Sequence, residues 1–189
     1  MLKKHRFFVF SIFVFLKLYK MKKYLLLIVF AFSTIAGFAQ EKDEEVTTYY
    51  LIRHAEKQRT NPNDKNPSLT FKGLKRADKW AEVLSSANIN MVYTTDYNRT
   101  KETAQPTADK NGLRMYVYNP SKMYDGGFKY NTKGKNVLIV GHSNTTPFFA
   151  NKILGKNVYK QIADDNNSNL YIVTVTKSGA TSVVLKINN

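Results

Sequence analysis

Short apolar runs alternate with segments of helical periodicity from residue 46 onward. Residues 46–52, 91–95, 115–118 and 137–140 are rich in β-branched or aromatic side chains. The last run is apolar throughout, which is typical of a strand covered on both faces of a sheet. The alternation predicts an α/β fold in which these four runs are parallel core strands.

The segment between the first two runs predicts an amphipathic helix over residues 71–85, capped by Thr70. Four apolar residues recur at helical spacing and are expected to face the sheet: Leu74, Ala77, Ala81 and Leu84. Four basic residues are expected on the solvent side: Lys72, Lys75, Arg76 and Lys79.

Two further helices are predicted. Residues 99–110 form one of them, and Pro106 predicts a kink or a late start there, because proline lacks the amide hydrogen of an interior helical position. The other follows Asn144, has Pro147 in its first turn and ends at Gly155. It is expected to turn four apolar residues towards the sheet: Phe148, Phe149, Ile153 and Leu154.

The chain closes with a predicted hairpin. Residues 170–176 and 181–187 have strand character, and a short connection containing Gly179 joins them, so an antiparallel pair is expected. Three segments without a regular apolar period are expected to be loops, the last of them bordering the site: residues 61–66, 164–169 and 121–135.

The first 39 residues hold two apolar segments, residues 7–18 and 25–39, flanked by Lys and Arg and free of acidic residues. This pattern is typical of a signal peptide. We therefore expect residues 1–39 to be removed on export, leaving a single domain over residues 40–189. Met21 precedes a second basic region, so translation could begin there. The alternative is an uncleaved membrane anchor, because the apolar stretch is near the lower limit for crossing a bilayer.

Composition narrows the functional classes. The chain has no cysteine, which excludes disulfides, thiol catalysis and thiolate metal sites. Seven of the 29 basic residues precede residue 40, which leaves 22 basic and 14 acidic residues and a net charge of +8 on the expected mature chain. This charge favours anionic partners such as phosphates. The lysines form no stripe interleaved with aromatic residues, so nucleic acid is not an expected partner.

Basic and imidazole side chains follow three of the apolar runs. Arg53 and His54 end the first run, Arg99 lies shortly after the second, and His142 follows the last. Because open α/β sheets bind ligands beyond the carboxyl ends of their strands, these side chains are expected to converge. Imidazole and guanidinium groups in one place suggest phosphoryl-transfer chemistry.

These motifs resemble the histidine phosphatase superfamily, also called the phosphoglycerate-mutase-like family. Arg53-His54 matches its Arg-His dipeptide, Arg99 its second arginine and Gly141-His142 its distal Gly-His pair. The resemblance covers residues 46–189 and implies a three-layer α/β/α sandwich with a mostly parallel mixed sheet of about six strands. It also implies that the first strand lies beside the fourth, and the fourth beside the second.

The resemblance implies that His54 attacks phosphorus and becomes a phosphohistidine, since neutral imidazole offers a lone pair near physiological pH. Arg53, Arg99 and His142 would bind the phosphoryl group, with Asn144 as a secondary contact. Neither a metal nor a cofactor is expected, because these groups can neutralise the phosphate.

The sequence does not identify the general acid that protonates the leaving group. Asp125 lies at about the distance from Arg99 at which many family members place a carboxylic acid, although an Asp before Gly-Gly is also typical of a turn. Glu56, just after the nucleophile, is a second candidate that could instead orient an arginine. Members that lack a clear acid act on phosphoramidates or on good leaving groups.

The sequence therefore predicts an exported, metal-independent phosphohydrolase that acts on a small phosphorylated substrate. We expect it in the periplasm of a bacterium, without stable membrane association after cleavage, or anchored if residues 1–39 are retained. The alternatives are a protein phosphohistidine phosphatase and a catalytically weak module that binds a phosphorylated ligand. The natural substrate and the oligomeric state are left open.

Overall fold

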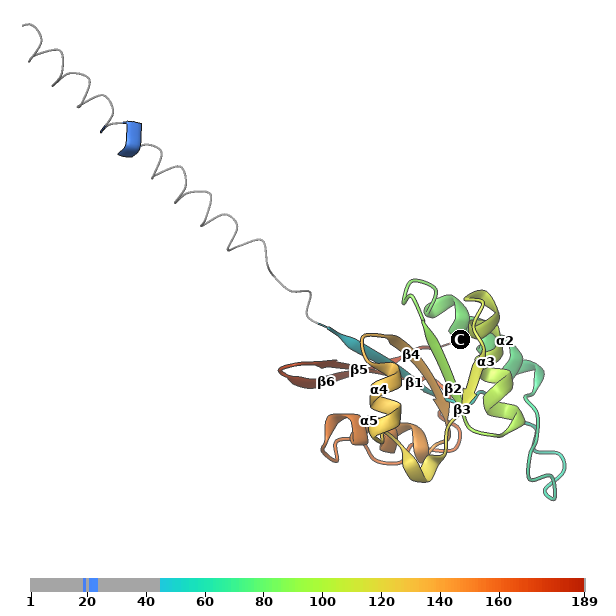
Figure 1. Ribbon diagram of the computed structural model, residues 1–189. Helices are drawn as coiled ribbons and strands as arrows, with labels where there is room; N and C mark the ends of the chain where they lie inside the picture. The colour runs from blue at the N-terminus through green and yellow to red at the C-terminus, as the bar shows by residue number, and fades with distance from the viewer. Residues whose placement is uncertain (1–18, 20, 24–44, 189) are drawn as a thin grey trace, which may run out of the picture. The chain divides into compact units, whose positions relative to one another are not determined.

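Six strands form one mixed sheet in the order β3-β2-β4-β1-β5-β6 (Figure 1). Neighbours from β3 to β1 pair in parallel, whereas β5 is antiparallel to β1 and β6 to β5. The predicted strand order and the closing hairpin are therefore confirmed. The strands are β1 (Thr47–Arg53), β2 (Met91–Thr94), β3 (Met115–Val117), β4 (Asn136–Gly141), β5 (Asn169–Thr176) and β6 (Gly179–Lys186).

The computed structural model describes residue 19, residues 21–23 and residues 45–188. Residues 45–188 belong to one compact unit. Apart from residues 19 and 21–23, the predicted signal peptide and its cleavage point lie outside the described residues. Within the described part, no helix is long and apolar enough to cross a bilayer.

Helices cover both faces of the sheet, with α2 and α3 on one face and α4 and α5 on the other (Figure 1). The alternation along β4 shows why: Leu138 and Val140 pack beneath α2 and α3, whereas Val137 and Ile139 pack beneath α4 and α5. This is the predicted three-layer α/β/α sandwich. The helices are α2 (Phe71–Val83), α3 (Asn98–Lys110), α4 (Gly126–Thr132) and α5 (Thr145–Leu154), with a 3₁₀ turn, η1 (Pro120–Lys122).

The first helix is capped as predicted and buries three of its four expected core residues, but two side chains lie on the opposite face from the one predicted. The Thr70 hydroxyl accepts a hydrogen bond from the Gly73 amide. Leu74, expected in the core, is 46% exposed, and Arg76, expected in solvent, is buried. Arg76 can lie inside because its guanidinium donates two hydrogen bonds to the carboxylate of Glu56, which satisfies the buried charge.

Two other helix predictions are corrected. Helix α3 begins at Asn98 and contains Pro106, so proline does not delay its start. In α5, Phe149 is fully buried while Phe148 is 45% exposed. Successive helical residues are about 100° apart, so these two neighbours cannot both face the sheet. The positive φ of 68° at Gly155 ends α5 as expected.

The segment 121–135 is not the loop that was predicted, because it contains the end of η1 and all of α4. Phe128 anchors α4, with its ring centroid 4.7 Å from that of Tyr93 and 5.1 Å from that of Phe149. A helix of seven residues shows barely two turns of apolar period, which is too little for recognition from the sequence.

Candidate active site

The parallel pairing of β1 with β4 brings the two histidines together. Arg53 lies opposite Gly141 in the register, and the His54 amide donates to the Gly141 carbonyl at 2.9 Å. The ring centroids of His54 and His142 are 5.3 Å apart, in an edge-to-face arrangement. A Cβ at residue 141 would lie 2.7 Å from the Thr145 hydroxyl, so glycine is needed where these elements meet.

His54 is buried and held in one tautomer. Its Nδ1 lies 2.7 Å from the Ala55 carbonyl oxygen. Because a carbonyl oxygen can only accept, Nδ1 carries the proton and Nε2 keeps a lone pair. Burial, together with the charges of Arg53, His142 and Arg99, lowers the pKa of His54 to about 3, although the hydrogen bond to the Ala55 carbonyl opposes this shift. The imidazole is therefore neutral at physiological pH and nucleophilic at Nε2.

Arg99, the second residue of α3, supplies donors without partners. Its guanidinium lies over the Tyr97 ring, with Cζ 4.3 Å from the centroid. The Nε and Nη1 atoms are buried, and no hydrogen-bond acceptor for them lies among the described residues. Buried polar groups are normally hydrogen-bonded, so an arginine in this state is poised to bind an anion.

His142 is held in the opposite tautomer. Its Nε2 lies 2.9 Å from the Thr95 hydroxyl, which lies 3.0 Å from the Thr100 hydroxyl. The Thr100 hydroxyl donates to backbone carbonyls, those of Thr95 and Tyr97 being within 3.0 Å. Thr95 must then donate to Thr100 and accept from His142, which places the proton on Nε2. Only Nδ1 of His142 is left for a ligand.

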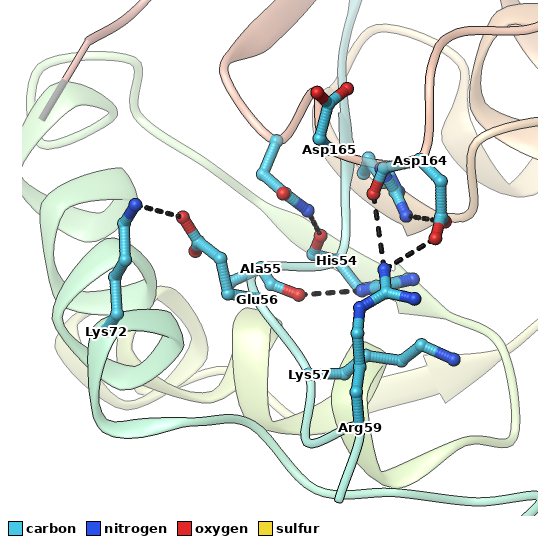
Figure 2. A pocket seen from close by; sticks show the side chains of 10 residues that line it. His54, Ala55, Glu56, Lys57, Arg59, Lys72, Asp164 and Asp165 are labelled. Atoms are coloured by element: carbon cyan, nitrogen blue, oxygen red, sulfur yellow. Dashed lines mark hydrogen bonds and ion pairs between the residues drawn. The ribbon is translucent and has the colours of Figure 1, made fainter. Parts of the chain in front are cut away.

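Two pockets flank His54. One, of about 390 Å³, is lined by Arg99, His142 and Asn144 and is called the Arg99 pocket below. The other, of about 490 Å³, is lined by Arg59, Lys72 and Asp165 and is called the Arg59 pocket (Figure 2). Four residues line both pockets: Arg53, His54, Lys57 and Asp164.

The family model of the histidine phosphatase superfamily (branch 1) matches residues 49–119. The matched segment contains Arg53, His54 and Arg99 and ends before His142. The resemblance to the histidine phosphatase superfamily is thereby confirmed. Members of this superfamily are phosphatases. No curated protein matches the chain in sequence.

Solved structures agree with this resemblance and show the histidine phosphatase fold. SixA from Agrobacterium tumefaciens is 16% identical with a TM-score of 0.58, and the match covers 75% of this chain and 99% of that one. Protein histidine phosphatase SixA complexed with tungstate is 15% identical with a TM-score of 0.58, over 74% and 96%. A mutant phosphoserine phosphatase from Entamoeba histolytica, in complex with phosphoserine, is 12% identical with a TM-score of 0.57, over 72% and 95%.

The predicted site residues of this histidine phosphatase fold converge, with one exception. Arg53, His54, Arg99, His142 and Asn144 all line the Arg99 pocket. Asn144 caps α5, because its side-chain oxygen accepts from the Thr145 amide at 2.8 Å.

Asp125 is the exception, because it lines neither pocket beside His54. It is the N-cap of α4, and its carboxylate accepts from the Phe128 amide at 2.8 Å. This contact fits the turn-forming alternative for an Asp before Gly-Gly. The proton-donor role of Asp125 stays a prediction.

The second candidate acid, Glu56, is tied to basic residues. Both of its oxygens accept from Arg76, and the Lys72 ammonium lies 3.7 Å away. Burial raises the pKa of Glu56, but the hydrogen bond from Arg76, a backbone hydrogen bond and the charges of Arg76 and Lys72 together outweigh this effect, and the net shift is downward. An ionised carboxylate held in this way orients the arginine and is a poor proton donor.

Three residues beside the site were not predicted. Asp164 and Asn167 come from a segment expected to be an exposed loop, yet Asn167 is buried and donates to the His54 carbonyl at 2.7 Å. Thr95 lies at the end of the β2 run, where its contact with His142 depends on the sheet order. Within the described residues, no group of three or more His, Asp or Glu side chains could hold a metal ion.

Proposed function

We propose that the chain is a phosphohydrolase that removes a phosphoryl group through a phosphohistidine at His54. One observation carries the proposal: His54 is neutral with a free Nε2 lone pair, and it lines the same pocket as the Arg99 donors that have no partner among the described residues. A nucleophile beside cationic donors is what attack on a phosphate dianion requires, because the donors offset the negative charge that repels the lone pair.

In the first step, the Nε2 lone pair of His54 forms a bond to phosphorus while the bond from phosphorus to the leaving oxygen breaks. The electron pair of that bond departs with the leaving group, which takes up a proton from solvent water. The proton on Nδ1 stays with the Ala55 carbonyl, which helps to stabilise the positive imidazole of the phosphohistidine.

In the second step, a water oxygen attacks the same phosphorus and the bond to Nε2 breaks. The water loses a proton, inorganic phosphate forms, and the lone pair returns to His54. Arg53 and Arg99 bind the phosphoryl oxygens through both steps. These side chains need not move, because they are set by β1 and by the start of α3.

His142 contributes a hydrogen bond to the phosphoryl group through Nδ1. Burial, together with the charges of Arg99, Arg53 and Lys57, lowers the pKa of His142 to about 4. A bound phosphate dianion opposes these charges and raises the pKa again. Ligand binding therefore draws a proton onto Nδ1, and His142 then donates to the phosphate.

The carboxylates near His54 are paired with basic side chains, and this limits the leaving groups that the site can protonate. Glu56 is paired with Arg76, and Asp164 with Arg53 and Arg59. We expect leaving groups that need little help from an acid, such as phenolates, or the nitrogen of a phosphoramidate. A protein phosphohistidine phosphatase is the second candidate, favoured by the likeness of the fold to SixA.

The test is release of phosphate from p-nitrophenyl phosphate by the full chain, beside the variant H54A. Hydrolysis that depends on His54 supports the proposal. A protein that binds inorganic phosphate but hydrolyses neither p-nitrophenyl phosphate nor phosphoramidate would instead be the weak binding module considered above.

We further propose export, supported by the basic and apolar pattern of residues 1–39. Fractionation of the native host, with N-terminal sequencing of the mature protein, should give a periplasmic chain beginning near Gln40. A chain that retains residues 22–39 in the membrane fraction would be an anchored protein instead.

A further inference from the structure

An exposed carboxylate lies between two guanidinium groups at the junction of the two pockets. One oxygen of Asp164 accepts from Nη2 of Arg53, and the other accepts from Nη2 of Arg59 at 2.5 Å. Figure 2 shows the Asp164 carboxylate and the Arg59 guanidinium facing each other beside His54. The arrangement resembles a bound anion, except that the anion belongs to the protein.

The carboxylate of Asp164 carries a full negative charge at physiological pH. Burial raises its pKa, but the hydrogen bond from Arg59 and the charges of Arg53 and Arg59 outweigh this effect and lower it. The Asp164 side chain is 63% exposed and that of Arg59 is 57% exposed, whereas that of Arg53 is 2% exposed. Asp164 can therefore turn out into solvent, while Arg53 stays in place.

Arg53 is only partly satisfied by these contacts. Its Nη1 donates to the backbone carbonyls of Ala163 and Asn166, at 3.0 and 3.3 Å, which holds the loop. Its Nε is buried, with no hydrogen-bond partner in the described part of the chain. The Nε and Nη2 hydrogens of arginine point along one edge and suit two oxygens of one anion. Asp164 accepts only from Nη2 on that edge of Arg53, because its other oxygen is bound to Arg59.

We propose that Arg53 and Arg59 form an anion site that Asp164 occupies in the free protein, and that a phosphoryl group enters this site by displacing Asp164. This inference rests on the proposed function and adds Arg59 to the residues that bind the phosphoryl group. A phosphoryl group brings three oxygens, enough for the Nε and Nη2 hydrogens of Arg53 and one donor of Arg59. Asp164 is then an internal competitor that sets how tightly phosphate binds.

The test is to titrate the full chain with inorganic phosphate and to measure the binding affinity by isothermal titration calorimetry. The variant D164N keeps the shape of the side chain and removes its charge, so it should bind phosphate about 10-fold more tightly, the scale of one charge-assisted hydrogen bond. The matched control is D165N, which changes the net charge equally but lines only the Arg59 pocket. It should bind within about 2-fold of the parent, since exposed charges are screened.

The Arg59 half of the site is tested in the D164N background. Adding R59Q should weaken phosphate binding roughly 10-fold relative to D164N alone, because a ligand contact is lost. Melting temperatures without phosphate check folding, and D164S replaces D164N if the latter does not fold.

Binding by D164N that is equal to D165N, or weaker than the parent, would overturn the inference and leave Asp164 as a loop anchor. The outcome is separable from the proposed function, because binding needs no turnover. If D164N binds phosphate more tightly but the parent shows no hydrolysis, the proposed function is overturned and the anion site stands. If the parent hydrolyses the substrate but D164N binds phosphate no more tightly than the parent, the proposed function stands and the anion site is overturned.

Discussion

The two pockets beside His54 differ in how their charges are satisfied. In the Arg99 pocket, two guanidinium nitrogens of Arg99 are buried without partners among the described residues. In the Arg59 pocket, Arg59 is paired with Asp164, and Lys72 lies 3.7 Å from Glu56. Unpaired buried donors cost stability, so their presence indicates a place kept ready for a ligand. Paired charges cost little in the free protein, but a ligand must separate them.

The two histidines differ in a parallel way. The Nδ1–H group of His54 donates a hydrogen bond to a backbone carbonyl, and its Nε2 is free. In His142, Nε2–H donates to the Thr95 hydroxyl, and Nδ1 is free. The surroundings, and not the residue type, thus assign one imidazole to attack and the other to hydrogen bonding.

The largest effect is expected at His54. In H54A, kcat for p-nitrophenyl phosphate should fall roughly 10⁴-fold, since the other imidazole of the Arg99 pocket, His142, takes up a proton on Nδ1 when the phosphate binds and then has no lone pair for attack. Steady-state kinetics measures the loss, and phosphate titration shows that the pocket is intact. A variant that keeps most of its turnover would remove His54 as nucleophile.

Comparing R99Q with R59Q sharpens the contrast between the pockets. R99Q should lower kcat/KM by roughly 10²- to 10³-fold, because it removes charge stabilisation in the transition state. R59Q should lower it by less than about 10-fold, because the lost ligand contact is partly offset by the easier displacement of Asp164. R99Q should not lower the melting temperature, as it removes an unpaired buried cation. Equal kinetic losses in both variants would break the distinction.

The pH dependence of stability follows from His54. Its folded pKa of about 3 lies below the unfolded value of about 6.5, so the unfolded chain takes up the proton first as the pH falls. Stability is complete above pH 6.5 and decreases towards pH 3, with a loss of about 2 kcal/mol at pH 5 from this group alone. Urea unfolding at pH 7.5 and pH 5 measures the change, which should be smaller in H54A.

A smaller effect is expected for the hydroxyl that sets the tautomer of His142. T95V should lower kcat/KM about 10-fold, because it removes one hydrogen bond and releases the ring. It should also shift the alkaline limb of the pH profile, which a purely structural defect would not do. T95S keeps the hydroxyl and should restore both the rate and the profile.

The smallest effect is expected at Asp125. Asn is as good an N-cap as Asp, so D125N should keep α4 and change kcat by less than about 2-fold. The measurement compares p-nitrophenyl phosphate with a phosphate ester of an aliphatic alcohol. A selective loss for the alkyl ester would instead make Asp125 the proton donor.

The convergence of Arg53, His54, Arg99 and His142 could be predicted because each lies just past a strand and parallel strands end at one edge. Asp164 and Asn167 could not, because they belong to the connection between α5 and β5, which has no apolar period that fixes its path. The buried position of Arg76 depends on Glu56, twenty residues earlier, so the charge pattern of α2 alone places it wrongly.

Trapping the phosphorylated protein tests whether His54 forms a phosphohistidine during turnover. The full chain is mixed with p-nitrophenyl phosphate, quenched in base, and digested for mass spectrometry, with phosphorus NMR to assign the ring nitrogen. An acid-labile phosphoryl group is expected on Nε2 of His54 in the parent protein and is expected to be absent from H54A. Turnover with no phosphorylated protein, or with the phosphoryl group on another residue, would contradict it.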